Sequence, residues 1–254
     1  MIIAEPLFTG KNKIYMPEMV STNAFATELL SKTNPSEGTC IITDFQTAGR
    51  GQIGRSWFSD PGQNVLISYI LYPKFIKISD QFYLNIISGL AVRDVVSMSC
   101  PEAKIKWPND IYVGNQKIAG ILVQNTLQGT TIKSTIIGMG LNVNQKYFSP
   151  ELPNPTSLHQ KTKIIFDISE IIGLLSARLE YHYLRMLRGQ TLDLLTEYTQ
   201  LMYRLEQWSR YSSVDDESTF EAKITGIDDD GYLVLCHKDM TIHSYGFRQI
   251  RYII

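Results

Sequence analysis

A segment rich in glycine and arginine, Gly49 to Trp57 (GRGQIGRSW), has the composition of an anion-binding loop. Glycine lets backbone amides approach an anion closely, and the guanidinium groups of Arg50 and Arg55 pair well with phosphate oxygens. The segment matches neither the GxxxxGK[ST] P-loop nor the GxGxxG dinucleotide fingerprint, so neither of those binding mechanisms applies. It predicts a phosphate-binding loop of another kind, with a mobile surface loop as the alternative.

A second segment, Lys106 to Asp110 (KWPND), places a cation, an aromatic ring, an amide and a carboxylate within five residues. Together these groups would bind ATP, with Asp110 near Mg²⁺, because Mg²⁺ prefers carboxylate and phosphate oxygens. The alternative is a strand broken by Pro108, with Trp107 in the core.

Two further motifs lie downstream of these segments. Lys117 belongs to the apolar segment KIAGILVQ, from which its amine would emerge beside Gly120. A lysine on a strand is more often simply solvated, and that is the alternative for Lys117. The segment 138–144 (GMGLNVN) ends a predicted strand with two glycines and two asparagine amides. Its alternative is a plain turn between a strand and a loop.

Periodicity and turn residues predict the elements that position these motifs. Ser21, Thr22 and Asn23 precede a helix predicted over 23–32, where short polar side chains accept bonds from free amides. Further helices are predicted over 80–99, from 167 to 188, and from 191 to about 206. Strands are predicted at 39–44, 64–71, 103–107, 110–113, 117–124, 131–143, 220–227, 231–236 and 240–245. The expected fold is α+β, with a mixed, mostly antiparallel sheet and flanking helices.

The polar stretch 207–218 predicts a domain boundary. We expect a catalytic domain over 1–208 and a small β-barrel over 209–254. A barrel of so few residues needs to dock on its neighbour to be stable.

Composition excludes several classes of protein. The chain has 24 Lys and Arg against 25 Asp and Glu, so no cationic excess is available for nucleic acid. The three cysteines are far apart and lack metal-ligand spacing, and the four histidines are scattered and interpreted as structural or surface residues. The sequence contains neither a signal peptide nor a membrane-spanning run, so we expect a soluble, cytoplasmic protein without a membrane partner.

The motifs STN, GRGQIGRSW, KWPND, KIAGI and GMGLNVN occur in this order between Ser21 and Asn144. In that order they resemble the biotin protein ligases, and the C-terminal β-module is similar too. The resemblance implies a catalytic domain like that of class II synthetases, followed by an SH3-like barrel. It also implies ATP-dependent biotin-[acetyl-CoA-carboxylase] ligase activity, in which biotin is adenylated and then transferred to a lysine of a biotin carboxyl carrier domain.

Position by position, the resemblance implies a biotin site beside an ATP site. The residues implied in biotin binding are Ser21, Thr22, Asn23, Gln46, Arg50, Gly51, Gln52, Lys117 and Gly120. Those implied on the ATP side are Arg50, Arg55, Trp57, Asn109, Asp110, Lys117 and Asn142. Arg50 and Lys117 would be the catalytic cations and Asp110 would hold Mg²⁺, while ATP and biotin are substrates and no tightly bound prosthetic group is expected.

Two features depart from the most familiar pattern of this family. About 20 residues precede Ser21, too few for the helix-turn-helix domain of the biotin-responsive repressors, so we expect a monofunctional enzyme. Gln52 stands where one familiar form of the loop has arginine. Rival interpretations are a lipoate protein ligase, which Gln46 and the STN segment disfavour, and a non-catalytic biotin-sensing module. The sequence leaves the oligomeric state open, with a homodimer as one candidate.

Overall fold

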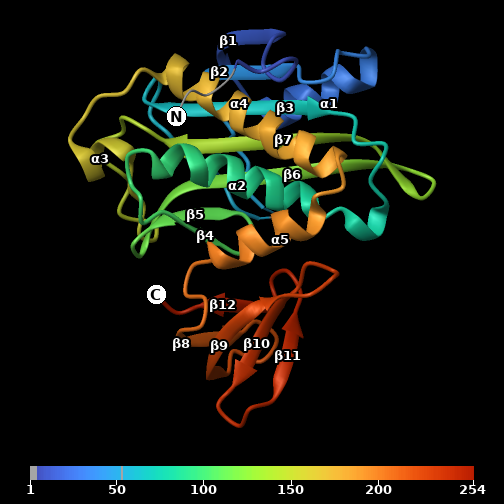
Figure 1. Cartoon of the computed structure of the whole chain (residues 1–254). Helices are drawn as coiled ribbons and strands as arrows, with labels where there is room; N and C mark the ends of the chain where they lie inside the picture. Colours follow the sequence, from blue (N-terminus) through green and yellow to red (C-terminus); the bar gives the residue numbers. More distant parts are fainter. Residues whose placement is uncertain (1–4, 53) are drawn as a thin grey trace.

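A computed structural model of the chain describes residues 5–52 and 54–254, and its larger sheet is mixed (Figure 1). Met1 to Ala4, part of the segment tested for a signal peptide, and Ile53 of the glycine-rich loop lie outside the described residues. The strands of this sheet are β1 (Lys13–Met19), β2 (Cys40–Gln46), β3 (Asn64–Leu71), β4 (Lys104–Lys106), β5 (Asp110–Val113), β6 (Gln116–Gln128) and β7 (Thr131–Asn142). Their order is β1-β2-β3-β7-β6-β5-β4, and only β1 and β2 pair in parallel. The prediction of a mixed, mostly antiparallel sheet is confirmed.

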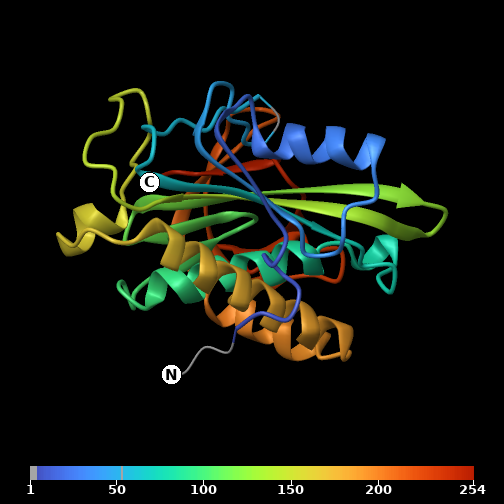
Figure 2. The ribbon, with the colours of Figure 1, turned by 90° about the horizontal axis from the view of Figure 1, so that it is seen from above.

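Helices cover both faces of this sheet. The helices are α1 (Thr22–Lys32), α2 (Tyr83–Ser97), α3 (Leu158–Thr162), α4 (Ile168–Leu187) and α5 (Thr191–Gln200), with a short 3₁₀ turn at Ile78–Asp80. Seen from above, α1 lies on one face, and α2, α4 and α5 lie on the other (Figure 2). All eight residues of β3 are buried, because this central strand is covered on both faces. A continuous apolar run is the pattern of such a strand.

The second sheet follows the last helix and is entirely antiparallel. It contains β8 (Trp208–Ser213), β9 (Thr219–Ile227), β10 (Leu233–His237), β11 (Ile242–Tyr245) and β12 (Ile250–Tyr252). These strands run in the order β11-β10-β9-β8-β12, which fits a small β-barrel. The sheet lies beside α5 and β4 at one end of the molecule (Figure 1).

The C-terminal segment that holds the second sheet contacts the rest of the chain at several points. The indole Nε1 of Trp107 donates to the carbonyl of Gly231 over 3.0 Å. The ring of Phe247 packs on those of Trp107 and Phe82, with centroids 5.3 and 5.9 Å apart. The backbone amide of Glu206 also donates to the carbonyl of Ile224 over 2.9 Å. The KWPND segment therefore touches the second sheet directly.

The prediction that the helix beginning at Thr191 continues to about Glu206 is wrong for residues 201–206. Helix α5 ends at Gln200, and the following residues pair with β4 instead. Ile105 donates to the carbonyl of Leu201 and accepts from the amide of Tyr203, over 2.9 and 2.8 Å. Arg204 then has a φ of 60°, which ends any helical path. Pairing with a strand edge has overridden the local helical pattern.

Strands β1, β8 and β12 and the short helix α3 were not predicted. β1 is an exposed edge strand with Pro17 inside it, and proline is tolerated in a sheet only at such an edge. β8 occupies the polar stretch that was interpreted as a boundary, yet its Tyr211 is fully buried between neighbouring strands. No helix in the described part of the chain is long and apolar enough to cross a membrane.

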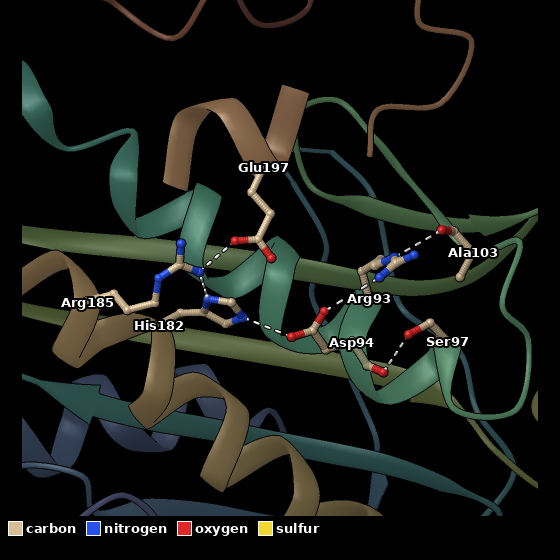
Figure 3. A network of polar contacts seen from close by, with 7 residues as sticks. All are labelled: Arg93, Asp94, Ser97, Ala103, His182, Arg185 and Glu197. Carbon is tan, nitrogen blue, oxygen red and sulfur yellow. Dashed lines mark hydrogen bonds and ion pairs between the residues drawn. The ribbon is translucent and has the colours of Figure 1, made fainter. Parts of the chain in front are cut away.

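A buried polar network connects the three helices on one face of the sheet (Figure 3). His182 on α4 is 0% exposed, and its Nε2 lies 3.0 Å from Asp94 Oδ2 on α2. Its Nδ1 lies 3.2 Å from a guanidinium nitrogen of Arg185, which in turn pairs with Glu197 on α5 over 2.6 Å. A guanidinium has no acceptor, so Nδ1 accepts from Arg185 and the neutral imidazole carries its proton on Nε2, toward Asp94. The interpretation of His182 as structural is confirmed.

Candidate active site

One cavity of about 90 Å³ gathers most of the predicted site residues on the α1 side of the larger sheet. It lies between the start of α1, the loop after β2, and the strands β5, β6 and β7. The predicted residues that line it are Ser21, Thr22, Asn23, Gln46, Arg50, Gly51, Gln52, Arg55, Trp57, Asn109, Asp110, Lys117 and Gly120. Segments up to about 100 residues apart in sequence therefore meet at one site.

A lysine–aspartate pair lies on the wall of this cavity. Lys117 Nζ is 2.6 Å from Asp110 Oδ1, and the two side chains are 29% and 12% exposed. The alternative of a merely solvated Lys117 is wrong, because the side chain turns inward to a buried carboxylate. Gly120 lies opposite Asp110 in the β5–β6 register, and a Cβ there would come within 3.3 Å of Lys117 Nζ. The absence of a side chain at Gly120 thus leaves room for the ammonium group.

The described residues on the two sides of the glycine-rich loop pair with each other beside the cavity. Arg50 and Ser56 form an antiparallel bridge, and the amide of Gly51 donates to the carbonyl of Arg55 over 2.9 Å. The ring of Trp57 lies against Gly120 and Gly140, where any Cβ on Gly140 would overlap it. Trp57 therefore forms part of the cavity wall.

The KWPND segment divides between the core and the site. Trp107 is 3% exposed and packs in the core, as its alternative interpretation predicted, whereas Asn109 and Asp110 line the cavity. Asn109 donates through its side chain to the carbonyl of Ile121 over 2.6 Å, which fixes β5 against β6. Burial lowers the pKa of Lys106 to about 8, and the nearby carboxylate of Asp110 offsets this only in part. Lys106 therefore loses its charge as the pH rises through about 8.

The start of α1 forms the polar end of the cavity. Ser21 caps the helix, with its side chain facing the amide of Ala24. Gln46 Oε1 accepts from the amide of Thr22 over 2.8 Å. Asn23 donates through Nδ2 to Gln124 Oε1 over 2.8 Å and contacts the carbonyl of Leu122 at 3.3 Å. A hydrogen-bonded network therefore holds the side chains at this end.

Asn142 is the one predicted site residue that does not line the cavity. It is buried, and its side-chain amide donates to the carbonyl of Thr156 over 2.9 Å. A role for Asn142 toward ATP stays a prediction. The cavity also includes residues that sequence reasoning did not assign, namely Ser56, Leu66, Ile121, Leu122, Gly138, Met139 and Gly140. Gly138 and Gly140 belong to the GMGLNVN motif, so only the assignment of their role was missed.

Comparison with known proteins identifies the family. A family model described as the biotin/lipoate A/B protein ligase family matches residues 15–142, about half of the chain. The bifunctional ligase/repressor BirA of Bacillus spizizenii is 34% identical over 232 residues, covering 89% of this chain and 70% of the relative. The biotin--[acetyl-CoA-carboxylase] ligase of Paracoccus denitrificans is 28% identical over 229 residues, covering 85% of this chain and 90% of the relative.

Solved structures agree with these relatives. A biotin protein ligase from Aquifex aeolicus in complex with biotin and ATP matches with a TM-score of 0.79 at 25% identity, over 96% of this chain and 100% of that chain. A biotin acetyl coenzyme A carboxylase synthetase from Helicobacter pylori matches with a TM-score of 0.59 at 21% identity, which supports the fold alone. From the family model, the sequence relatives and the shared fold, this chain belongs to the biotin/lipoate A/B protein ligase family.

Proposed function

We propose that this chain adenylates biotin with ATP and transfers the biotinyl group to a lysine of a biotin carboxyl carrier domain. The observation that carries the proposal is the single cavity where Lys117, Asp110 and the glycine-rich loop meet the polar start of α1. Its relatives and structural neighbours carry the names of biotin ligases, which favours biotin over lipoate as substrate.

In the first step, a biotin carboxylate oxygen would attack the α-phosphorus of ATP. The bond to the bridging oxygen would break, pyrophosphate would leave, and negative charge would grow on the phosphate oxygens. The ammonium of Lys117 lies inside the cavity, and Arg50 and Arg55 lie on its loop, so three cations can face that charge. Preorganised charges of this kind stabilise a transition state without reorganisation.

In the second step, the ε-amine of the carrier lysine would attack the acyl carbon of biotinyl-adenylate. An amide bond forms, AMP departs with the electron pair of the broken anhydride bond, and the amine releases a proton to solvent. Neither step requires a covalent bond to the enzyme. Positioning and electrostatics are then the contributions expected of this cavity.

The cavity's side chains fit a Mg²⁺ ion that arrives with ATP. Asp110 is the carboxylate among the described residues that line the cavity, and only its Oδ1 pairs with Lys117. Mg²⁺ is commonly held by one or two carboxylates together with substrate phosphates and water. Asp110 would be the protein ligand, and the ion would supply further neutralisation of phosphate charge. Among the described residues, no group of three or more His, Cys, Asp or Glu forms a metal site by itself.

Biotin-dependent exchange of labelled pyrophosphate into ATP tests adenylation directly. The purified chain with ATP, Mg²⁺ and biotin should exchange pyrophosphate, and adding a carrier domain should give a carrier heavier by one biotinyl group. Lipoate in place of biotin should support neither reaction. Exchange with lipoate but not biotin would favour the rival ligase, and biotin binding without any exchange would favour a sensing module.

We further propose that the enzyme works in the cytoplasm with a catalytic domain over 1–208 and a barrel over 209–254. The free, buried thiols of Cys40, Cys100 and Cys236 are compatible with that compartment. A homodimer stays a prediction. It is supported by β6, whose residues beyond Ile121 have no partner strand on the β5 side within the described chain.

Exchanging Gln52 for arginine should slow release of biotinyl-adenylate. Gln52 lines the cavity, where a neutral amide would contribute about 1 kcal/mol per hydrogen bond to the adenylate, against roughly 1.5 to 3 for a charged group. We expect preformed adenylate to dissociate about tenfold more slowly from Gln52→Arg, measured without carrier. Gln128→Arg adds the same charge on the exposed part of β6 and should leave the rate unchanged. Equal rates for wild type and Gln52→Arg would show that position 52 does not control retention.

A further inference from the structure

Two lysines are placed to pair with the carboxylate of Asp110, and the ion pair is made by Lys117. Its Nζ lies 2.6 Å from Asp110 Oδ1. Lys106, on β4, stands directly opposite Asp110 in the antiparallel β4–β5 register. Side chains at such opposed positions share one face of a sheet, with Cβ atoms roughly 4.5 to 5.5 Å apart. The flexible four-carbon stem of a lysine can cross that gap, so Lys106 is within reach of Asp110.

The ammonium of Lys106 lies on two tyrosine rings and not on this carboxylate. Its Nζ is 4.4 Å from the centroid of the Tyr252 ring and 5.3 Å from that of Tyr112. Tyr112 follows Asp110 by two residues on β5, whereas Tyr252 belongs to β12 of the second sheet. A cation within about 6 Å of a ring centroid is attracted by the negative face of the ring. The two rings therefore form a cage for the Lys106 ammonium.

A third tyrosine fixes the position of both cage rings. Tyr203, which follows α5, is 6% exposed, and its ring centroid lies 5.2 Å from that of Tyr112 and 6.2 Å from that of Tyr252. Its hydroxyl donates to Asn115 Oδ1 over 2.6 Å, which anchors it to the turn between β5 and β6. The hydroxyl of Tyr252 is buried without a hydrogen-bond partner among the described residues. Tyr252 therefore contributes to the cage through its ring.

The cage determines how many cations Asp110 has as direct partners. With Lys106 held on the rings, the printed ion pair of Asp110 is the one between Oδ1 and Lys117. A Lys106 released from the cage would bring a second ammonium to the same carboxylate, because the register places the two side chains together. Each added ammonium occupies lone pairs that a carboxylate otherwise offers to a metal ion or another donor.

We propose that Tyr252 is a positioning residue that, with Tyr112, holds the Lys106 ammonium off Asp110 and so keeps one carboxylate oxygen open for the Mg²⁺ that accompanies ATP. The inference rests on the proposed function, since it concerns the ATP side of the same site. Mg²⁺ is held by few protein carboxylates together with substrate phosphates, so one occupied oxygen has a large effect on it. A strand of the second sheet thereby sets the ligands available in the first.

The test opens the cage with Tyr252→Leu, in pyrophosphate exchange at pH 7, where Lys106 carries its charge. We expect KM for ATP to rise about tenfold, the effect of losing one charge-assisted contact, with kcat and KM for biotin unchanged. Tyr252→Phe keeps the ring and should match the wild type. Trp208→Leu, which removes a ring 4.2 Å from Lys238 on the same sheet, is the control and should also match it.

Removing Lys106 separates positioning from damage to the second sheet. Lys106→Met fills the cage with a flexible apolar side chain that packs well on aromatic rings, so KM for ATP should stay at the wild-type value. Combined with Tyr252→Leu, it should return the raised KM for ATP to that value, whereas structural damage would persist. Tyr112→Leu opens the other wall of the cage and should raise KM for ATP in the same way, even if Tyr252→Leu does not fold.

A crystal structure of ligand-free Tyr252→Leu or Tyr112→Leu gives a readout that does not depend on activity. Lys106 Nζ should lie within about 4 Å of an Asp110 oxygen there. Unchanged KM for ATP in both tyrosine variants, no suppression by Lys106→Met, a raised KM in Lys106→Met alone, or a Lys106 that stays away from Asp110 would overturn the inference. Absence of biotin-dependent exchange by the wild type would instead overturn the proposed function, and the crystal structure would still test the cage.

Discussion

Replacing Lys117 with glutamine is expected to lower biotin-dependent pyrophosphate exchange by about 100- to 1000-fold, the usual loss when one preorganised donor is removed from a charged transition state. The ammonium of Lys117 lies within the cavity, and its loss removes one of the three cations that can face the growing phosphate charge. Because the interaction forms mainly in the transition state, kcat should fall much more than KM for biotin rises.

Glutamine is preferable to alanine here because of Asp110. That carboxylate is 12% exposed and bonded to Lys117, so alanine would leave it buried without a partner and destabilise the fold. A glutamine amide still donates to Asp110 while removing the charge. Lys133→Gln, on the exposed side of β7, is the matched control and should exchange at the wild-type rate. Near-normal exchange by a folded Lys117→Gln protein would remove Lys117 from the proposed chemistry.

Replacing His182 with alanine should lower the free energy of unfolding by about 3 kcal/mol, at the low end of the cost of breaking a buried charged network. The imidazole bridges Asp94 and Arg185, and both lose a partner when it is removed (Figure 3). The network lies across the sheet from α1, so kcat and KM at permissive temperature should not change.

Urea unfolding monitored by tryptophan fluorescence and by far-ultraviolet circular dichroism measures the effect. Lys32→Ala, which breaks the exposed Lys32–Glu28 pair on α1, is the control and should leave the unfolding midpoint unchanged. If His182→Ala unfolds at the wild-type midpoint, the network does not stabilise the helix layer.

Regular elements were predictable wherever local pattern and tertiary environment agree. The run NVLISYIL is apolar throughout and became β3, a strand buried on both faces, with the predicted limits 64–71. Prediction failed where partners distant in sequence decide the conformation. Leu201 to Tyr203 continue a helical pattern, yet they pair with Ile105 about 100 residues away. Such a pairing leaves no trace in the local periodicity.

The residues of the candidate site were largely predictable, whereas the contacts between them were not. Motif residues such as Lys117 were found because their types and order carry the family resemblance, and the cavity gathers nearly all of them. The direct ion pair between Lys117 and Asp110 was not foreseen, since seven positions along a chain do not specify an adjacent antiparallel register.

The contacts of Trp107 and Phe247 have a consequence for the cooperativity of the whole chain. The indole N–H of Trp107 donates to the carbonyl of Gly231, and the indole packs against Phe247. Opening the second sheet would therefore leave this N–H without its acceptor and expose the rings of Trp107 and Phe82. Sub-global opening of the C-terminal strands alone is therefore costly. Amide protons of β9 and of β5 should then exchange with deuterium at similar limiting free energies, as one foldon that spans both sheets.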